Sequence, residues 1–215
     1  MMDKKRLRAK LLKWHNSNNR NHYPWRNTDS PYQILVAEIL LQRTKADQVL
    51  PIYFTFIKEF PDISSLAVAD EKRIAQIIYP LGLSWRAKNF NTTANNIINN
   101  FNGLFPKKRN DLLRIKGVGE YVADSILYNA FKIRTSIIDS NIIRIIGRLF
   151  GLKTTPESRR NKIFRDYAND LLPKNNYRIF NYALLDLGAL ICVRKPKCDI
   201  CPINSYCLFY NNHGG

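Results

Sequence analysis

Apolar residues recur at spacings of three and four along most of the chain, and the alternation that marks a strand is hard to find. Residues 89–102 are rich in asparagine, yet they keep an apolar face made of Phe90, Ala94, Ile97, Ile98 and Phe101. Glycine is sparse, with 9 among 215 residues. We therefore predict an all-α protein.

Capping signals mark where two of these helices begin. Ser30 precedes Pro31 and an apolar run over 32–44, which predicts a capped helix with proline in its first turn. Asp139 or Asn141 is the expected cap of a second helix over 142–150. Because no repeat and no low-complexity linker interrupts the chain, the helices are expected to pack into one compact body.

The charge of the chain indicates a polyanionic partner. Lys and Arg number 34 against 17 Asp and Glu, a net charge of +17 that is spread along the sequence. Nucleic acid is the favoured partner, although ribosomal and membrane-surface proteins are also basic. Since no apolar run approaches the roughly 18 residues of a membrane span and no secretory signal is visible, we expect a cytoplasmic, nucleoid-associated protein with no membrane partner.

Residues 111–131 read as a helix, a tight turn at Gly117-Val118-Gly119 and a second helix. The two glycines permit unusual backbone angles and let a phosphate approach bare N–H groups at a helix N-terminus. Lys116 adds a full positive charge. Such a turn binds a DNA backbone whatever its base sequence, whereas the alternative is an ordinary tight connection between helices.

All four cysteines lie near the C-terminal end, separated by five, two and five residues: Cys192, Cys198, Cys201 and Cys207. Four thiolates at such spacing suit a 4Fe-4S cluster or a tetrahedral zinc ion, and disulfides are disfavoured in a reducing compartment. The first gap also carries the cations Arg194, Lys195 and Lys197, which we expect to contact phosphates.

These motifs together resemble the helix-hairpin-helix DNA glycosylases, a family that includes endonuclease III, adenine-DNA glycosylase and the archaeal thymine/uracil mismatch glycosylases. The resemblance spans almost the whole chain: Pro24-Trp25-Arg26, Pro31-Tyr32, residues 37–44, the 117–119 turn, residues 138–144 and the cysteines. It implies two helical lobes, a barrel at 24–130 with the hairpin and a cluster lobe built from 1–23 and 131–215. It also implies a monomer that binds duplex DNA with a mismatched or damaged base, and a 4Fe-4S cluster with zinc as the alternative. The family normally has six residues in the first cysteine gap, one more than here.

The resemblance assigns the chemistry to Asp139, whose carboxylate would stabilise the positive charge that builds on the sugar as the base departs. By sequence pattern alone the favoured role of Asp139 is that of a helix N-cap, and only the family resemblance favours catalysis. Endonuclease III-like enzymes carry a Schiff-base lysine two residues after the second glycine, where this chain has Tyr121. The resemblance therefore implies a glycosylase that hydrolyses the bond without cutting the strand, with packing as the alternative role of Tyr121.

The choice of base rests on few residues. Glu38 lies in an apolar run and is either a proton donor to the base or a carboxylate on one face of a helix. Gln42 and Arg43 are expected to fill the gap left by the flipped base, and Arg43 resembles the thymine enzymes more than the adenine enzymes. Gly82-Leu83-Ser84 shares this resemblance, and Trp85-Arg86, one residue short of the usual pattern, is expected beside it on the DNA. We expect thymine or uracil opposite guanine as substrate. Adenine opposite 8-oxoguanine or guanine, oxidised pyrimidines removed with strand cutting, and a non-catalytic damage-binding module are the alternatives.

Overall fold

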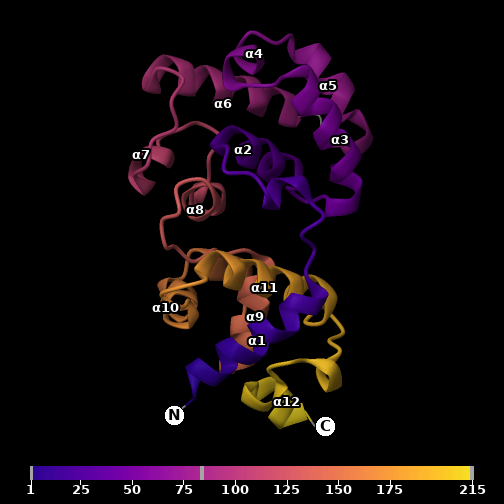
Figure 1. The fold of residues 1–215 in the computed structure, drawn as a ribbon, viewed down its shortest axis with the longest axis vertical. Helices are drawn as coiled ribbons and strands as arrows, with labels where there is room; N and C mark the ends of the chain where they lie inside the picture. Colours follow the sequence, from indigo (N-terminus) through magenta and orange to yellow (C-terminus); the bar gives the residue numbers. More distant parts are fainter. Residues whose placement is uncertain (1, 83–84, 214–215) are drawn as a thin grey trace. The chain divides into compact units, whose positions relative to one another are not determined.

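The computed structural model describes residues 2–82 and 85–213, and within them every regular element is a helix and none is a strand (Figure 1). The all-α prediction is therefore confirmed. The chain divides into two compact units, Asn21–Ile133 and Met1–Arg20 with Arg134–Gly215. We call them the hairpin unit and the cysteine unit and describe each by itself; the predicted barrel range was 24–130.

The hairpin unit is built around helix α2 (Pro31–Leu40), which buries eight of its ten residues. Helices α3, α6 and α8 pack against it. Because α2 is covered from several sides, a polar side chain on it such as Glu38 must find its partner inside the unit. The helices of this unit are α2, α3 (Ala46–Glu59), α4 (Ile63–Ala67), α5 (Glu71–Ile78), α6 (Trp85–Phe101), α7 (Arg109–Leu112) and α8 (Glu120–Asn129).

Helix α2 begins where the capping signal predicts and ends earlier than the apolar run. The Ser30 hydroxyl accepts a hydrogen bond from the Gln33 N–H, and Pro31 is the first helical residue. The helix stops at Leu40, because the following turn places Arg43 at a φ of 58°, in the left-handed region. The prediction of a helix to residue 44 is wrong by one turn.

The asparagines of α6 hold neighbouring segments in place. Asn91 and Asn95 donate to the carbonyls of Ala69 and Ala67, at 3.2 and 3.1 Å. Thr93 donates to the Lys116 carbonyl at 2.8 Å and Asn96 accepts from the Lys116 N–H at 3.2 Å. The polar face of this helix is therefore the support of the hairpin and of the α4–α5 connection.

The cysteine unit packs α1 (Lys4–Asn18) and α9 (Ser140–Phe150) against α11 (Tyr177–Leu190). Buried Asp186 on α11 accepts from Arg20 at 2.9 Å, which fixes the end of the N-terminal segment. The unit is completed by α10 (Lys162–Leu171), two short helical turns at Cys198–Ile200 and Asn204–Tyr206, and α12 (Leu208–His213). None of the described helices combines the length and apolarity that crossing a membrane requires.

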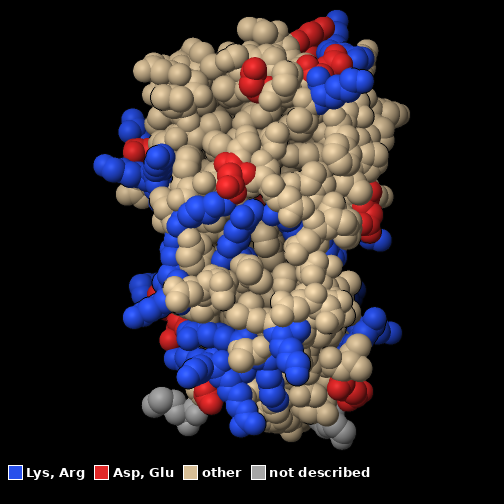
Figure 2. All heavy atoms as spheres, in the orientation of Figure 1, with Lys and Arg blue, Asp and Glu red and all other residues tan. Residues whose placement is uncertain are grey.

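Positive charge is concentrated in the cysteine unit. This unit contains 20 of the 34 Lys and Arg residues but only 7 of the 17 Asp and Glu. Figure 2 shows basic side chains gathered over this unit on the face drawn, whereas those near α5 of the hairpin unit form a smaller group mixed with acidic side chains. The charge excess inferred from composition is therefore mainly a property of one unit.

Candidate active site

The hairpin turn lies between α7 and α8 and is anchored by apolar side chains. Val118 and Ile115 are buried, whereas Lys116, Gly117 and Gly119 are exposed. Val118 can therefore reach DNA only through its backbone. The first helix is shorter than predicted: α7 ends at Leu112, and single turns, with Ile115 N–H bonded to Leu112 and Val118 N–H to Ile115, lead into α8.

Helix α8 presents its N-terminal backbone at this turn. Gly119 is its N-cap and provides no capping side chain. Arg109 donates to Asp124 at 2.7 Å and to Glu120 at 3.1 Å, which ties α7 to α8. The helix N-terminus is thus held rigidly beside exposed Lys116, an arrangement suited to a phosphate.

The two glycines of the hairpin make a matched pair of tests. Gly117 has a φ of 90°, and a Cβ there would lie 2.2 Å from the buried Thr93 Oγ1 and 2.5 Å from Asn89 Oδ1. We expect Gly117→Ala to lower the free energy of unfolding by at least about 1–2 kcal/mol, the usual cost of a left-handed alanine, measured by urea denaturation.

Gly119 is the control for this test, because its φ of −87° is ordinary and a Cβ there would meet nothing within 4 Å. Gly119→Ala should therefore change stability far less than Gly117→Ala, because the poorer capping by alanine is offset by its stiffer unfolded chain. It should still weaken binding to undamaged duplex, since the added methyl stands where a phosphate would approach the backbone. Unchanged DNA affinity in Gly119→Ala would contradict a phosphate contact at this turn.

Glu38 is buried on α2 and faces α8. The Ser125 hydroxyl donates to Glu38 Oε1 at 2.5 Å, and Asn129 donates to the Ser125 oxygen at 3.4 Å. The carboxylate is thus buried and accepts a hydrogen bond from a hydroxyl group, and it does not point out into solvent from one side of the helix. A role in catalysis stays a prediction for this residue.

The turn over residues 41–44 carries the two residues expected to fill the DNA gap. Arg43 is exposed and Gln42 is half-buried. Trp85, the first residue of α6, is 48% exposed and available to a ligand. Leu83 and Ser84, part of the motif shared with the thymine enzymes, lie outside the described residues.

Arg86 requires a correction, because its side chain has no exposed surface. Its guanidinium donates to the carbonyls of Leu40 (3.0 Å) and Gln42 and to Thr44 Oγ1 (2.6 Å). These hydrogen bonds attach the Arg86 side chain to the 41–44 turn of its own unit. The expected direct contact of Arg86 with DNA is not what this geometry favours.

Asp139 is the N-cap of α9 in the cysteine unit. Its Oδ1 accepts from the Ile142 N–H at 2.7 Å and its Oδ2 from the Asn141 amide at 2.9 Å. Desolvation raises the pKa of Asp139, against the lowering effect of these hydrogen bonds and of the Arg144 charge. A carboxylate fixed by two donors and poorly solvated is well prepared to face a positive charge.

A chain of contacts that the sequence motifs did not reveal connects Asp139 to the first cysteine. Asn141 Oδ1 accepts from Arg144 at 2.8 Å, and Arg144 Nε donates to the Cys192 carbonyl at 2.6 Å. Arg148, one turn further along α9, donates to Cys192 Sγ at 3.3 Å and to the Val193 carbonyl at 2.7 Å. Helix α9 thereby carries the carboxylate at its start and supports the cysteine loop at its end.

The four cysteines are free, partly buried thiols, and Cys192, Cys198 and Cys207 lie close enough to Cys201 to affect its ionisation. Burial, reinforced by the neighbouring Cys192, Cys207 and Cys198, raises the pKa of Cys201 to about 11. Among the described residues, no three His, Cys, Asp or Glu side chains converge as ligands of a metal ion. Four sulfurs with an arginine donor on one of them are nevertheless a donor set that fits thiolate-bound iron and sulfide. The loop cations are exposed, as expected for phosphate contacts: Arg194, Lys195 and Lys197.

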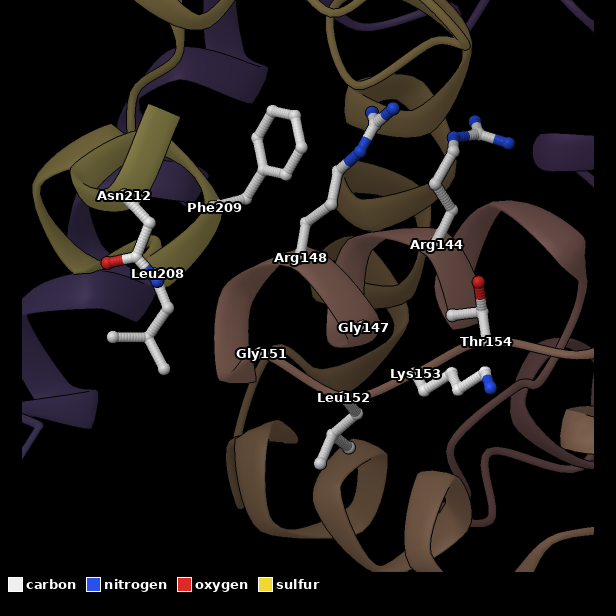
Figure 3. A pocket seen from close by; sticks show the side chains of 10 residues that line it. All are labelled: Arg144, Gly147, Arg148, Gly151, Leu152, Lys153, Thr154, Leu208, Phe209 and Asn212. Carbon is white, nitrogen blue, oxygen red and sulfur yellow. The ribbon is translucent and has the colours of Figure 1, made fainter. Parts of the chain in front are cut away.

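A cavity of about 520 Å³ lies beside this loop, between the end of α9 and α12 (Figure 3). Arg144, Arg148 and Lys153 line it together with Leu208 and Phe209, and none of its lining residues is acidic. The Arg148 guanidinium lies 5.0 Å from the Phe209 ring centre. The cavity therefore belongs to the basic surface of the cysteine unit.

Fold, hairpin and cysteine loop define a helix-hairpin-helix protein that binds DNA and holds an iron-sulfur cluster. Residues 36–169 match the HhH-GPD superfamily base excision DNA repair proteins, and residues 193–207 match the iron-sulfur binding domain of endonuclease III. The chain belongs to the HhH-GPD superfamily, and it is a base-excision DNA glycosylase, an enzyme acting on N-glycosyl bonds.

The individual relatives include both thymine and adenine glycosylases. Thymine-DNA glycosylase of Aeropyrum pernix is 36% identical over 96% of this chain and 95% of its own length. Adenine DNA glycosylase of Buchnera aphidicola is 33% identical over 94% of this chain, which spans 58% of that relative. Among solved structures, a thermostable thymine-DNA glycosylase superposes with a TM-score of 0.88 at 34% identity, covering 97% of both chains. A non-covalent endonuclease III–DNA complex, at 20% identity and a TM-score of 0.82 over 99% of both chains, shows the shared fold.

Proposed function

We propose that this glycosylase is a monofunctional, monomeric enzyme that removes thymine or uracil mispaired with guanine from duplex DNA. The observation that carries the proposal is the poorly solvated carboxylate of Asp139 at the start of α9. In addition, the first turn of the hairpin helix α8 holds Tyr121 where a Schiff-base enzyme has lysine. Arg43 on the 41–44 turn and the thymine glycosylase relatives support the choice of base.

The reaction needs a flipped nucleotide and a water molecule. As the C1′–N1 bond lengthens, its electron pair leaves with the pyrimidine and positive charge builds on the sugar, where ionised Asp139 stabilises it. Water bonds to C1′ and gives up one proton to the Asp139 carboxylate, while the departing pyrimidine anion takes up a proton from solvent. The products are the free base and an abasic site. Tyr121 offers no amine, so the strand stays intact.

DNA is held by groups that do not take part in the chemistry. The backbone at Gly117 and Gly119 with Lys116, and the cations Arg194, Lys195 and Lys197, are our proposed phosphate contacts. Gln42 and Arg43 are proposed to occupy the gap left by the flipped base, with Trp85 beside them.

We propose that the iron-sulfur cluster is of the 4Fe-4S type, held by Cys192, Cys198, Cys201 and Cys207. When bound, it supplies a rigid, electrostatically fixed anchor for the loop between the first two ligands. Arg148, which contacts Cys192 Sγ and two carbonyls of this loop, would complete that anchor. Iron and acid-labile sulfide analysis distinguishes the cluster from zinc.

Adenine excision is the second candidate, because Glu38 is a buried carboxyl group with a hydroxyl partner, an environment that suits a proton donor to a departing adenine. Adenine glycosylases also occur among the relatives.

A single experiment separates these functions. Single-turnover assays on labelled duplexes with T:G, U:G, A:8-oxoG, A:G and an oxidised pyrimidine, with and without alkali, report both base and mechanism. We expect breaks at T:G and U:G only after alkali. Preferential cutting at A:8-oxoG would favour the second candidate, and release of no base from any duplex would exclude both.

A further inference from the structure

Arg86 is a fully buried cation whose hydrogen bonds all go to one short segment, residues 40–44. It donates to the Leu40 carbonyl at 3.0 Å, to the Gln42 carbonyl and to Thr44 Oγ1 at 2.6 Å. Its Nε has no hydrogen-bond partner among the described residues. No ion pair found among the described residues joins Arg86 to a carboxylate. Burying an unneutralised guanidinium is costly, so its position demands a compensating role.

The segment that Arg86 holds is under backbone strain. Arg43, between two of the acceptors, has a φ of 58°, which disfavours any residue other than glycine, asparagine or aspartate. Thr44 Oγ1 also donates to the Gln42 carbonyl at 3.3 Å. The hydrogen bonds of Arg86 to both sides of Arg43 therefore stabilise a conformation that the turn would not keep alone.

The same helix supports the hairpin. Thr93 and Asn96 of α6 bind the Lys116 backbone, and Thr93 follows Arg86 by seven residues. Seven residues make about two helical turns and about 10 Å of rise, so both side chains lie on one face of α6. The 41–44 turn and the 117–119 turn are thus attached to one rigid element at a fixed spacing.

We propose that Arg86 is a positioning residue that holds the 41–44 turn in register with the phosphate-binding hairpin, so that Gln42 and Arg43 meet the base stack where the target base leaves it. This inference rests on the proposed function. It assigns Arg86 to base flipping through the turn, in place of the direct DNA contact expected from sequence.

The test compares substitutions at both ends of one hydrogen bond. Arg86→Lys keeps the charge and loses the branched donor group, Arg86→Gln loses both, Thr44→Val removes the acceptor and Thr44→Ser retains it. Lys88→Gln, an exposed cation on the same helix, is the matched control. Each variant is measured for single-turnover base release, for fluorescence of 2-aminopurine beside the mismatch, and for salt-dependent binding to undamaged duplex.

We expect Arg86→Lys, Arg86→Gln and Thr44→Val each to lower base release and the 2-aminopurine signal by about tenfold or more, with undamaged-duplex affinity and its salt slope unchanged. Thr44→Ser and Lys88→Gln should behave like the unaltered enzyme. The Arg86→Gln/Thr44→Val double variant should be no worse than the worse single one, because both remove the same interaction.

Two outcomes would overturn the inference. Full activity in Arg86→Lys would show that the branched guanidinium is not needed to hold the turn. A salt slope lowered by about one in Arg86→Gln would make Arg86 a phosphate contact. If the Arg86 variants do not fold, Thr44→Val with wild-type activity would refute it alone. Should the unaltered enzyme release no base, the proposed function fails, yet its 2-aminopurine signal on a duplex with an abasic analogue still tests the positioning role.

Discussion

Asp139→Asn is expected to slow base release by about 10²–10³-fold while leaving DNA binding intact, because it removes the charge that opposes the developing cation of the sugar. Asparagine is as good an N-cap as aspartate, so the hydrogen bond to the Ile142 N–H survives in the variant. The substitution therefore separates the catalytic role of Asp139 from its role in capping α9.

The pKa of Asp139 gives this prediction a second readout. Since desolvation raises that pKa in the folded chain, ionising Asp139 costs more in the folded chain than in the unfolded one, and the ionised form therefore destabilises the fold. This penalty is complete above the raised pKa of the folded chain, shrinks as the pH falls below that pKa, and is gone below the ordinary pKa of the unfolded chain. Asp139→Asn should therefore unfold at the same temperature as the unaltered protein or a higher one, whereas Asp139→Ala should lose about 1 kcal/mol with its cap.

Asp166→Asn, at an exposed aspartate of the same unit, is the matched control and should keep full activity. Single-turnover release, duplex binding and thermal unfolding are measured on all four proteins. An Asp139→Asn enzyme with normal turnover would refute the catalytic assignment. An unaltered protein that binds mismatched DNA tightly and never releases a base would instead be the damage-binding module.

Tyr121→Lys is expected to gain what the unaltered enzyme lacks, a covalent adduct with DNA that borohydride traps. Tyr121 lies in the first turn of α8 and packs half-buried against the core of the hairpin unit, directly after the exposed N-terminal backbone of that helix. A lysine amine there would attack C1′ and form a Schiff base, whereas a phenol cannot. We expect no trapped adduct from the unaltered enzyme and a readily detected one from the variant.

Tyr121→Phe controls for the loss of the hydroxyl group and should trap nothing. The result also tests Lys116, the exposed amine before the glycines. An adduct formed by the unaltered enzyme and abolished in Lys116→Gln would show that Lys116 attacks the sugar in place of the lysine that endonuclease III-like enzymes carry at position 121. The enzyme would then cut strands.

Sequence patterns predicted those parts of the structure that depend on neighbouring residues. The starts of α2 and α9 follow from Ser30 and Asp139, whose side chains bind N–H groups three residues ahead. The end of α2 was missed, because the strained backbone at Arg43 is supported by Arg86, more than forty residues further along the chain. No local signal reports such a contact.

In the candidate site, too, local motifs were predictable and contacts between distant residues were not. Family motifs identified Asp139, Tyr121 and the cysteines, since each occupies a fixed place within a short pattern. The bridge through Asn141 and Arg144 to the Cys192 carbonyl was not foreseen, because its acceptor is a backbone atom 48 residues from the donor. One signal could have pointed to this bridge: an arginine in an otherwise apolar helix, with no acidic residue nearby in the sequence to pair with it.

Helix α6 limits how this chain can change in length over evolution. One residue inserted between Arg86 and Thr93 would rotate one of them by about 100° around the helix, so that the helix could no longer hold both of its turns. An insertion of seven residues would restore the face but separate the turns by about 10 Å more. Natural insertions and deletions should therefore accumulate outside residues 86–93, and this short stretch should keep its length even in distant relatives whose sequences have otherwise diverged.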